Sequence, residues 1–342
     1  MRTQSFIAAC LSCVLCASVA AQKPSELIQR VQSADANSAL DAPDLKPWHL
    51  KLSVQLFDDK GKPTDQGTIE EWWKSDGSDR REYSTNAYKA TEIRAGGKLY
   101  RSKDVPSPPY LLELLREQVV HPVSHSDLDG QLRPEIRRDP FGKVQLECVM
   151  LSQTLKQFGA IPLGLFPTYC FDVGQDALRA SFQFGEQFVL RNALGAFEGR
   201  HVATRVIVTT GTIPEAKADV EKLEVLSAAD FETRISPDLI EREAHPVELS
   251  SGTVAGMALD QPTPNYPLSA RQQRESGTVV LHAILGADGH IHALKLVSTP
   301  GADLAISAIA AVRRWKYKPY LVEGVPVDVE TTINVNYTFG PR

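Results

Sequence analysis

The sequence predicts an α+β protein with two parts. The first is a mostly antiparallel β domain with one or two helices, which could form a half-barrel. The second is a small domain with a three-stranded antiparallel sheet and one helix. Many short segments alternate apolar and polar residues, which is the period of a strand with one buried face. A length of 342 residues suits about two domains, and 42% apolar residues allow both to bury a core.

The charge of the chain argues against nucleic acid as a partner. Lysine and arginine number 37 against 42 aspartates and glutamates, which gives a formal net charge of −5. Proteins that bind nucleic acid take much of their affinity from cationic side chains that face the phosphate backbone. The sequence has no surplus of cationic side chains for such contacts.

The first residues predict a signal peptide over residues 1–21. Arg2 precedes an apolar stretch at 6–20, and small residues at 18–21 suit a signal peptidase. The apolar run of about 15 residues is shorter than the roughly 20 that cross a bilayer as a helix. We therefore expect an exported protein with a cleaved signal. An uncleaved anchor stays open as the alternative.

Two cysteines, Cys148 and Cys170, remain after the signal peptide. An even number of cysteines in an exported chain favours a disulfide bond between them. Two buried free thiols are the alternative. We expect no catalytic role for either cysteine.

The N-terminal domain is predicted over residues 22–245. It begins with an amphipathic helix at 24–33, and a second helix is predicted at 109–119. The predicted strands are 48–56, 68–74, 80–85, 89–100 with a turn at Gly96-Gly97, 144–151, 169–173, 177–184, 201–209 and 218–226. This architecture resembles the half-barrel of periplasmic lipoprotein carriers of the LolA type. That resemblance implies that an apolar ligand could bind here.

A connection between the domains is predicted over residues 246–262, where prolines and glycines interrupt any regular period. Strands are then predicted at 277–285 and 291–297, a helix at 303–315 and a last strand at 327–339. Several short motifs occur in this part, and their residues are Tyr266, Pro267, Gly277, Asp288, Gly289, Arg313, Arg314, Trp315 and Pro319. The order and spacing of these motifs over residues 263–342 resemble the C-terminal domain of the TonB family.

The last strand is the candidate binding site. The residues on the apolar face of this strand, which we name as the partner-binding residues, are Val327, Val329, Thr331, Ile333, Val335 and Tyr337. The resemblance implies that this strand lies at the edge of the sheet, where an extended peptide can add as a further strand. In the TonB family that peptide is the TonB box of an outer-membrane transporter. A second copy of the chain or the first domain could cover the same edge instead.

The chain departs from the energy-transducing members of the family. Those members have an inner-membrane helix with a histidine and a long proline-rich spacer. Here no histidine precedes His49, and the region before the C-terminal domain has the pattern of a folded domain. We therefore expect a periplasmic protein with the binding fold. A carrier of a lipid or another apolar ligand and a signal-anchored energy transducer are the alternatives.

The sequence gives no indication of an enzyme. Motifs for a nucleophilic serine, a zinc protease, a phosphate loop or a dinucleotide site are missing from it, and no cofactor is expected. His290 and His292 share a strand face and His282 could lie nearby, but these histidines fit exposed strand residues better than a metal site. His121 and His125 flank a proline and are read as part of a loop.

Overall fold

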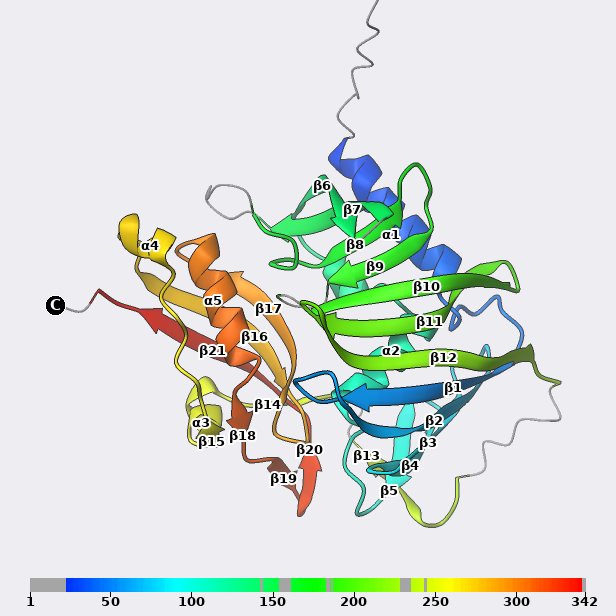
Figure 1. Cartoon of the computed structure of the whole chain (residues 1–342). Helices are drawn as coiled ribbons and strands as arrows, with labels where there is room; N and C mark the ends of the chain where they lie inside the picture. Colours follow the sequence, from blue (N-terminus) through cyan, green and yellow to red (C-terminus); the bar gives the residue numbers. More distant parts are fainter. Residues whose placement is uncertain are drawn as a thin grey trace, which may run out of the picture.

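A single sheet of 13 strands dominates the N-terminal part of the computed structural model (Figure 1). The structure describes residues 23–141, 144–153, 161–182, 185, 187–227, 235–242 and 245–339. The predicted signal peptide lies outside these residues. All neighbouring strands of this sheet pair antiparallel, as predicted.

The strand order across the sheet is β13-β5-β4-β3-β2-β1-β12-β11-β10-β9-β8-β7-β6. The strands are β1 (Trp48–Phe57), β2 (Pro63–Trp73), β3 (Asp79–Thr85), β4 (Lys89–Ala95), β5 (Lys98–Ser102), β6 (Leu132–Phe141), β7 (Val144–Gln153), β8 (Thr168–Asp172), β9 (Leu178–Phe182), β10 (Gln187–Phe197), β11 (Arg200–Thr210), β12 (Ile213–Val225) and β13 (Leu239–Arg242). The sequence analysis missed β6, β10 and β13.

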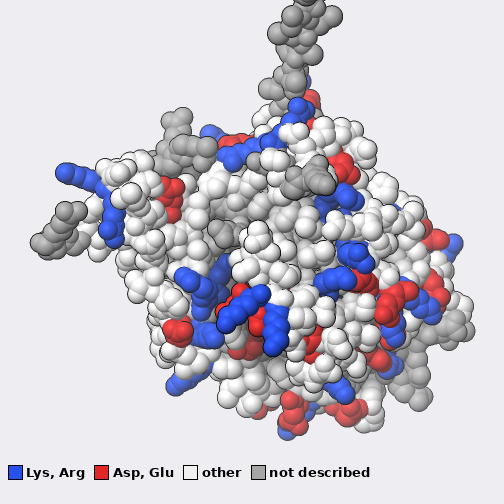
Figure 2. Space-filling view, viewed as in Figure 1, with Lys and Arg blue, Asp and Glu red and all other residues white. Residues whose placement is uncertain are grey.

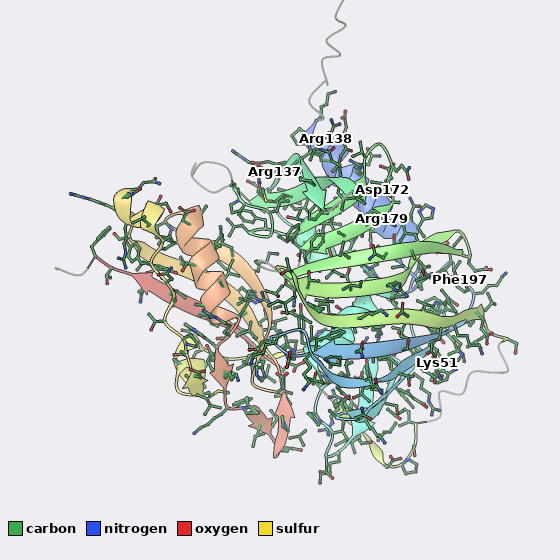
Figure 3. All side chains as sticks on the ribbon, in the orientation of Figure 1. Lys51, Arg137, Arg138, Asp172, Arg179 and Phe197 are labelled. Carbon is green, nitrogen blue, oxygen red and sulfur yellow. A yellow bond between two sulfur atoms is a disulfide. The ribbon has the colours of Figure 1, made fainter. Side chains whose placement is uncertain are left out.

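Helices α1 (Pro24–Ser38) and α2 (Tyr110–Val120) cover one face of this curved sheet (Figure 1). Both were predicted, although α1 extends further than expected. Leu27 and Val31 of α1 pack against β7, β8 and β9, while Leu112 and Leu115 of α2 pack against β1, β11 and β12. A short 3-10 helix, η1 (His125–Asp127), follows α2. The opposite face is polar around Lys51, which pairs with Glu70 at 2.9 Å (Figure 3).

A disulfide joins Cys148 on β7 to Cys170 on β8. The two residues lie directly opposite each other in the antiparallel register. Both are fully buried with Leu146, Ala180 and Phe188. The bond therefore ties neighbouring strands together near one end of the sheet, and the prediction of a disulfide is confirmed.

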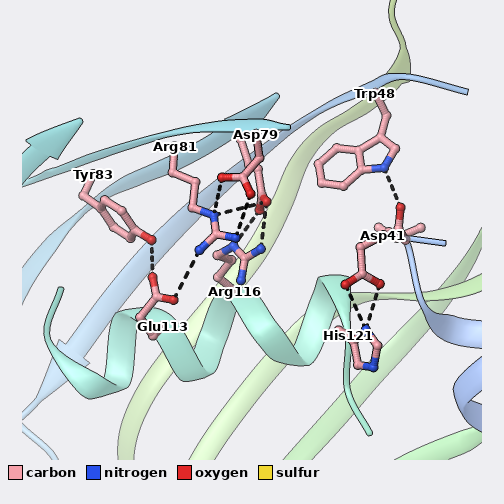
Figure 4. A network of polar contacts seen from close by, with 10 residues as sticks. Asp41, Trp48, Asp79, Arg81, Tyr83, Glu113, Arg116 and His121 are labelled. Carbon is pink, nitrogen blue, oxygen red and sulfur yellow. Dashed lines mark hydrogen bonds and ion pairs between the residues drawn. The ribbon is translucent and has the colours of Figure 1, made fainter. Parts of the chain in front are cut away.

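Buried ion pairs hold α2 on the sheet (Figure 4). Arg116 of α2 donates two hydrogen bonds of 2.7 Å to the carboxylate of Glu71 on β2. Arg81 on β3 donates to the same carboxylate at 3.3 Å and also pairs with Asp79. Burial alone would raise the pKa of Glu71, but the two guanidinium groups hold it below its usual range. The buried carboxylates of Glu71 and Asp79 are thus paired with the guanidinium groups of Arg81 and Arg116.

The C-terminal part has its own sheet, with the strand order β14-β21-β16-β17. Its strands are β14 (Val247–Glu248), β16 (Gly277–Leu285), β17 (Ile291–Ser298) and β21 (Val329–Tyr337). The other elements are α3 (Ser251–Ala255), β15 (Ala258–Asp260), α4 (Leu268–Gln272), α5 (Ala302–Val312), β18 (Lys316–Tyr317), β19 (Tyr320–Val322) and β20 (Val325–Val327). Helix α5 packs its buried face, including Leu304 and Ala308, on this sheet.

Four expectations for the C-terminal part are corrected. The sheet has four strands instead of three and is not wholly antiparallel, because β14, from the predicted connection at 246–262, pairs with β21 in parallel. The last strand was predicted to lie at the edge of the sheet, but β14 lies beside the start of β21, so β21 has an unpaired edge only beyond Glu330. The connection also carries α3 and β15, so it is structured. Helix α5 ends at Val312, three residues before the predicted end, and Arg313 caps it.

The two parts share a hydrophobic core. Met150, Leu165 and Phe166 of the N-terminal part are buried in the cluster that holds α5, β16, β17 and β21.

Among the residues described, no helix is both long and apolar enough to cross a membrane. On the face seen in Figure 2, basic and acidic side chains are interspersed.

The Arg116→Met variant should lose about 3–5 kcal/mol of unfolding free energy, because it removes the bidentate partner of a buried carboxylate. The Lys51→Met variant, which breaks a partly exposed ion pair with Glu70, should lose less than about 1 kcal/mol. Urea unfolding of both variants at neutral pH measures the difference. Similar small losses in the two variants would contradict a stabilising role for the network under α2.

Candidate functional site

The outer edge of β21 is only partly paired. Along its other edge, β21 pairs with β16 from Val329 to Tyr337. On the outer edge, Val247 N–H donates to Asp328 C=O at 2.8 Å and Leu249 N–H donates to Glu330 C=O at 2.9 Å. The chain then turns into α3. No backbone group in the described ranges pairs with the outer edge beyond Glu330.

The unpaired part of this edge presents the backbone of Thr332, Asn334 and Asn336. Alternate residues of a strand direct their N–H and C=O groups to the same side. Because Asp328 and Glu330 direct theirs toward β14, the even-numbered residues that follow direct theirs toward the open side. We call this stretch, Thr332 to Asn336, the open edge of β21. Its three outward-facing residues are also exposed through their side chains.

Five of the six residues predicted for the binding strand lie on the buried face of β21. Val329 is fully buried, and Thr331, Ile333, Val335 and Tyr337 are at most 6% exposed. Their side chains pack beneath α5, with the Tyr337 ring in the same core. They therefore support the strand, while the backbone and side chains of the even-numbered residues are available to a partner. The sequence analysis named these residues as the partner-binding set; the alternation of buried and exposed residues is confirmed, and the contact with a partner stays a prediction.

The prediction of one strand over residues 327–339 is wrong at its start. Val327 belongs to β20, where it pairs with Tyr320 of β19. Asp328 separates β20 from β21, and its carboxylate accepts a hydrogen bond of 2.8 Å from the Ala287 amide. Val329 begins β21, but Val247 of β14 already lies beside it. Neither valine therefore belongs to the open edge.

Tyr266 and Pro267 close one end of the C-terminal sheet. The Tyr266 hydroxyl donates to the backbone carbonyl of Glu275. Its ring meets the Tyr337 ring edge-on, with 5.4 Å between centroids. Pro267 occupies the N-cap position of α4. These residues anchor the segment before β16 against the end of β21.

Gly289 and Asp288 form the turn between β16 and β17. Gly289 has a φ of +78°, and a Cβ atom there would lie 2.1 Å from the backbone oxygen of Tyr317, so glycine is required. Asp288 accepts from the His290 amide at 2.9 Å and lies 2.9 Å from Nε2 of His292. Burial opposes ionisation of Asp288, but these hydrogen bonds lower its pKa well below the usual value. Gly277, with a φ of +138°, begins β16.

The residues after α5 connect the two parts of the chain. Arg313 donates to Glu215 at 3.1 Å and to Thr210 Oγ1 at 2.9 Å, both in the N-terminal sheet. The half-buried Trp315 donates to the Pro262 carbonyl at 3.0 Å. Arg314 is exposed and donates to the Ala310 carbonyl. Pro319 lies exposed between β18 and β19.

A cavity of about 720 Å³ lies at this junction. Its apolar wall includes Leu56, Phe57, Leu111, Ile213 and Ile306, and Arg313 and Arg314 contribute cationic groups. Asp58, Asp59, Glu215 and Asp288 also line the cavity, so its charged groups have both signs and its apolar wall is the feature that suits an apolar ligand. The sequence analysis missed this cavity because its walls come from both parts of the chain.

The structure does not bring His282, His290 and His292 together as a metal site. His282 Nε2 lies 2.6 Å from Glu330, whereas His290 and His292 both contact Asp288. A different group in the described part of the chain has a spacing that suits a metal ion, namely Asp35, His121 and His125. It lies in the N-terminal part, outside the edge and the cavity described above.

Two solved structures resemble the chain at low sequence identity. A LolA superfamily protein from Nitrosomonas europaea is 10% identical, with a TM-score of 0.37, over 60% of this chain and 95% of that one. A DUF1329 family protein from Desulfovibrio piger is 9% identical, with a TM-score of 0.37, over 61% of this chain and 97% of that one.

Sequence comparison identifies relatives of the C-terminal part. Protein TonB of Vibrio cholerae is 38% identical over 68 residues, which are 20% of this chain. The chain thus spans 28% of the length of that relative. Residues 262–339 also match the family described as Gram-negative bacterial TonB protein C-terminal. These two matches confirm the predicted resemblance of the C-terminal residues to the TonB C-terminal domain family.

Proposed function

We propose that this is an exported periplasmic protein that binds an envelope partner by β-strand addition at the open edge of β21. The partner is an outer-membrane transporter or another envelope protein with an extended segment. One observation carries the proposal. The backbone groups of Thr332, Asn334 and Asn336 on the outer edge of β21 are unpaired, whereas the other edge of the strand is paired with β16 along its whole length. The TonB family match over residues 262–339 supports this binding mode and a role linked to transport across the envelope.

The open edge suits weak and reversible binding. It offers three N–H and three C=O groups, one of each from Thr332, Asn334 and Asn336. Each new hydrogen bond contributes about 1 kcal/mol net, and ordering the peptide offsets part of that gain. β14 limits the register, since an added strand cannot extend past Glu330 without displacing Leu249. A peptide of about six residues therefore fills the site.

Polar side chains beside the open edge favour selective pairing over aggregation. Thr332, Asn334 and Asn336 are exposed and uncharged. Thr278 Oγ1 donates to Asn336 Oδ1 at 2.7 Å across the sheet, which orients that amide. Side chains of an added strand on the same face would contact these amide groups. Sequence selectivity would then arise from hydrogen bonds on this face of the sheet.

The Asn334→Pro variant should weaken binding of a TonB-box peptide about tenfold or more. Proline removes an N–H that points away from β16, so it blocks the added strand while an edge strand tolerates it. Isothermal titration with the full-length protein measures the affinity, and circular dichroism checks that the variant folds. The Asn334→Ala variant is the matched control, because it keeps the backbone donor and should bind nearly as well as the wild type. Unchanged binding by the folded proline variant would contradict strand addition at this edge.

The same edge could pair with a second copy of the chain. In that case the wild type would be a dimer in solution and Asn334→Pro would be a monomer. Light scattering during size-exclusion chromatography distinguishes the two states. A dimer that persists in the proline variant, together with unchanged peptide binding, would place both interactions elsewhere.

The cavity at the junction supports a second candidate function, that of a carrier for a lipid or another apolar molecule. Each buried methylene contributes about 0.8 kcal/mol, so an acyl chain could bind tightly in a cavity of 720 Å³. Arg314 is exposed at its rim and could pair with a carboxylate or phosphate group. A carrier role and strand addition use different surfaces and are tested separately.

The Ile306→Trp variant should reduce binding of the fluorescent fatty acid cis-parinaric acid by about tenfold or more, because the indole occupies part of the cavity. Leu321→Trp, at a residue that is 54% exposed, is the control and should bind as the wild type does. Fluorescence titration measures both affinities. Equal binding by the two folded variants would rule out the cavity as the ligand site.

A further inference from the structure

Three side chains from separate segments converge beside α1. Asp35 belongs to α1, His121 follows the last residue of α2, and His125 begins η1. His121 Nε2 lies 3.3 Å from Asp35 Oδ1, and His125 Nε2 lies 3.0 Å from Asp35 Oδ2. One ligand atom from each of the three residues lies within 4.8 Å of the other two. The fold thus gathers two imidazoles and a carboxylate in a small volume.

His121 Nε2 and Asp35 Oδ1, which are 3.3 Å apart, have the spacing of two neighbouring ligands of a small metal ion, and the third ligand atom lies within 4.8 Å of both ligand atoms. Zinc binds histidine nitrogen and carboxylate oxygen at about 2.0–2.2 Å, which places neighbouring tetrahedral ligands about 3.3 Å apart. Asp35 Oδ1 is buried, and among the described residues its nearest cationic partner is His121 Nε2 at 3.3 Å, without the geometry of a good hydrogen bond. An ion between these atoms would satisfy this buried oxygen.

A second carboxylate fixes the orientation of His121. Its Nδ1 lies 2.7 Å and 3.0 Å from the two oxygens of Asp41, as the close view shows (Figure 4). This contact places the Nδ1 proton on the side of Asp41 and directs Nε2 toward Asp35. Histidines that bind metals commonly have such a carboxylate on the other ring nitrogen, which sets the tautomer and strengthens the ligand.

We propose that Asp35, His121 and His125 bind a divalent transition-metal ion, with Zn²⁺ as the best match. Two nitrogens and one oxygen suit zinc better than calcium or magnesium, which prefer oxygen ligands alone. The side chain of His125 is 72% exposed, so the site opens to solvent and water completes the coordination. Asp41 is the positioning residue. No part of this proposal depends on the open edge of β21.

The bound metal would link the C-terminal end of α1 to the segment that follows α2. Asp35 lies near the end of α1, whereas the two histidines belong to the segment that leaves α2. α1 is otherwise held by its apolar face and by Arg30, which pairs with Glu147 at 3.0 Å. A metal that binds the folded state alone raises its stability by mass action. The metal would therefore stabilise the packing of the C-terminal end of α1.

Zinc titration of untagged, chelator-treated full-length protein tests the proposal. We expect one Zn²⁺ per chain by calorimetry and a higher melting temperature with zinc, which a chelator reverses. The His125→Ala and Asp35→Asn variants should bind at least tenfold more weakly. Asp41→Asn should weaken binding 10- to 100-fold without removing a ligand. His282→Ala, at a histidine paired with Glu330, is the control and should bind as the wild type does.

Absorption of bound Co²⁺ gives a second measurement that does not depend on stability. Its visible bands report on the coordination of the ion and should be lost in the His125→Ala variant, which changes an exposed side chain and should fold normally. Absence of stoichiometric zinc binding by the wild type would overturn the proposal and leave only ion pairs at this place. Unchanged zinc binding by the folded His125→Ala and Asp35→Asn variants would overturn it as well.

Discussion

The backbone of β21 can form hydrogen bonds on both sides, and only the side facing β16 is paired along its whole length. β14 completes the outer side at Asp328 and Glu330 and then turns away into α3. A strand with an unpaired edge in water can accept another strand, and its buried face beneath α5 keeps it rigid enough to do so. The proposed binding of an envelope partner rests on this difference between the two edges.

The packing between the two parts of the chain leaves the open edge of β21 at the surface of the molecule. Arg313 links α5 to Glu215 of the N-terminal sheet, and Phe166 enters the core beneath α5. In Figure 1 the end of β21 points away from the larger sheet. The N-terminal part therefore supports the C-terminal sheet from one side and leaves the edge accessible. The same packing also forms the cavity, which is separate from the open edge of β21 and has Arg314 in its lining.

Alternating polarity predicted β1, β16 and β17 because each has one buried face. It missed β6, which has two prolines and several charges and lies at the edge of its sheet. It missed β10, where Ala193 has a φ of +51° and interrupts the alternation. β14 has only two residues, which is too short for any pattern. Asp35 and His125 meet although they are 90 residues apart, so their proximity follows from the packing of α1 and α2.

Amide hydrogen exchange of β21 in the free, full-length protein tests the central claim most directly. The account predicts fast exchange at Thr332, Asn334 and Asn336, whose N–H groups face the open side, and slow exchange at Ile333 and Val335, whose N–H groups face β16. Equal, strong protection at all five amides would mean that another segment already pairs with the edge. That result would contradict an edge available to a partner.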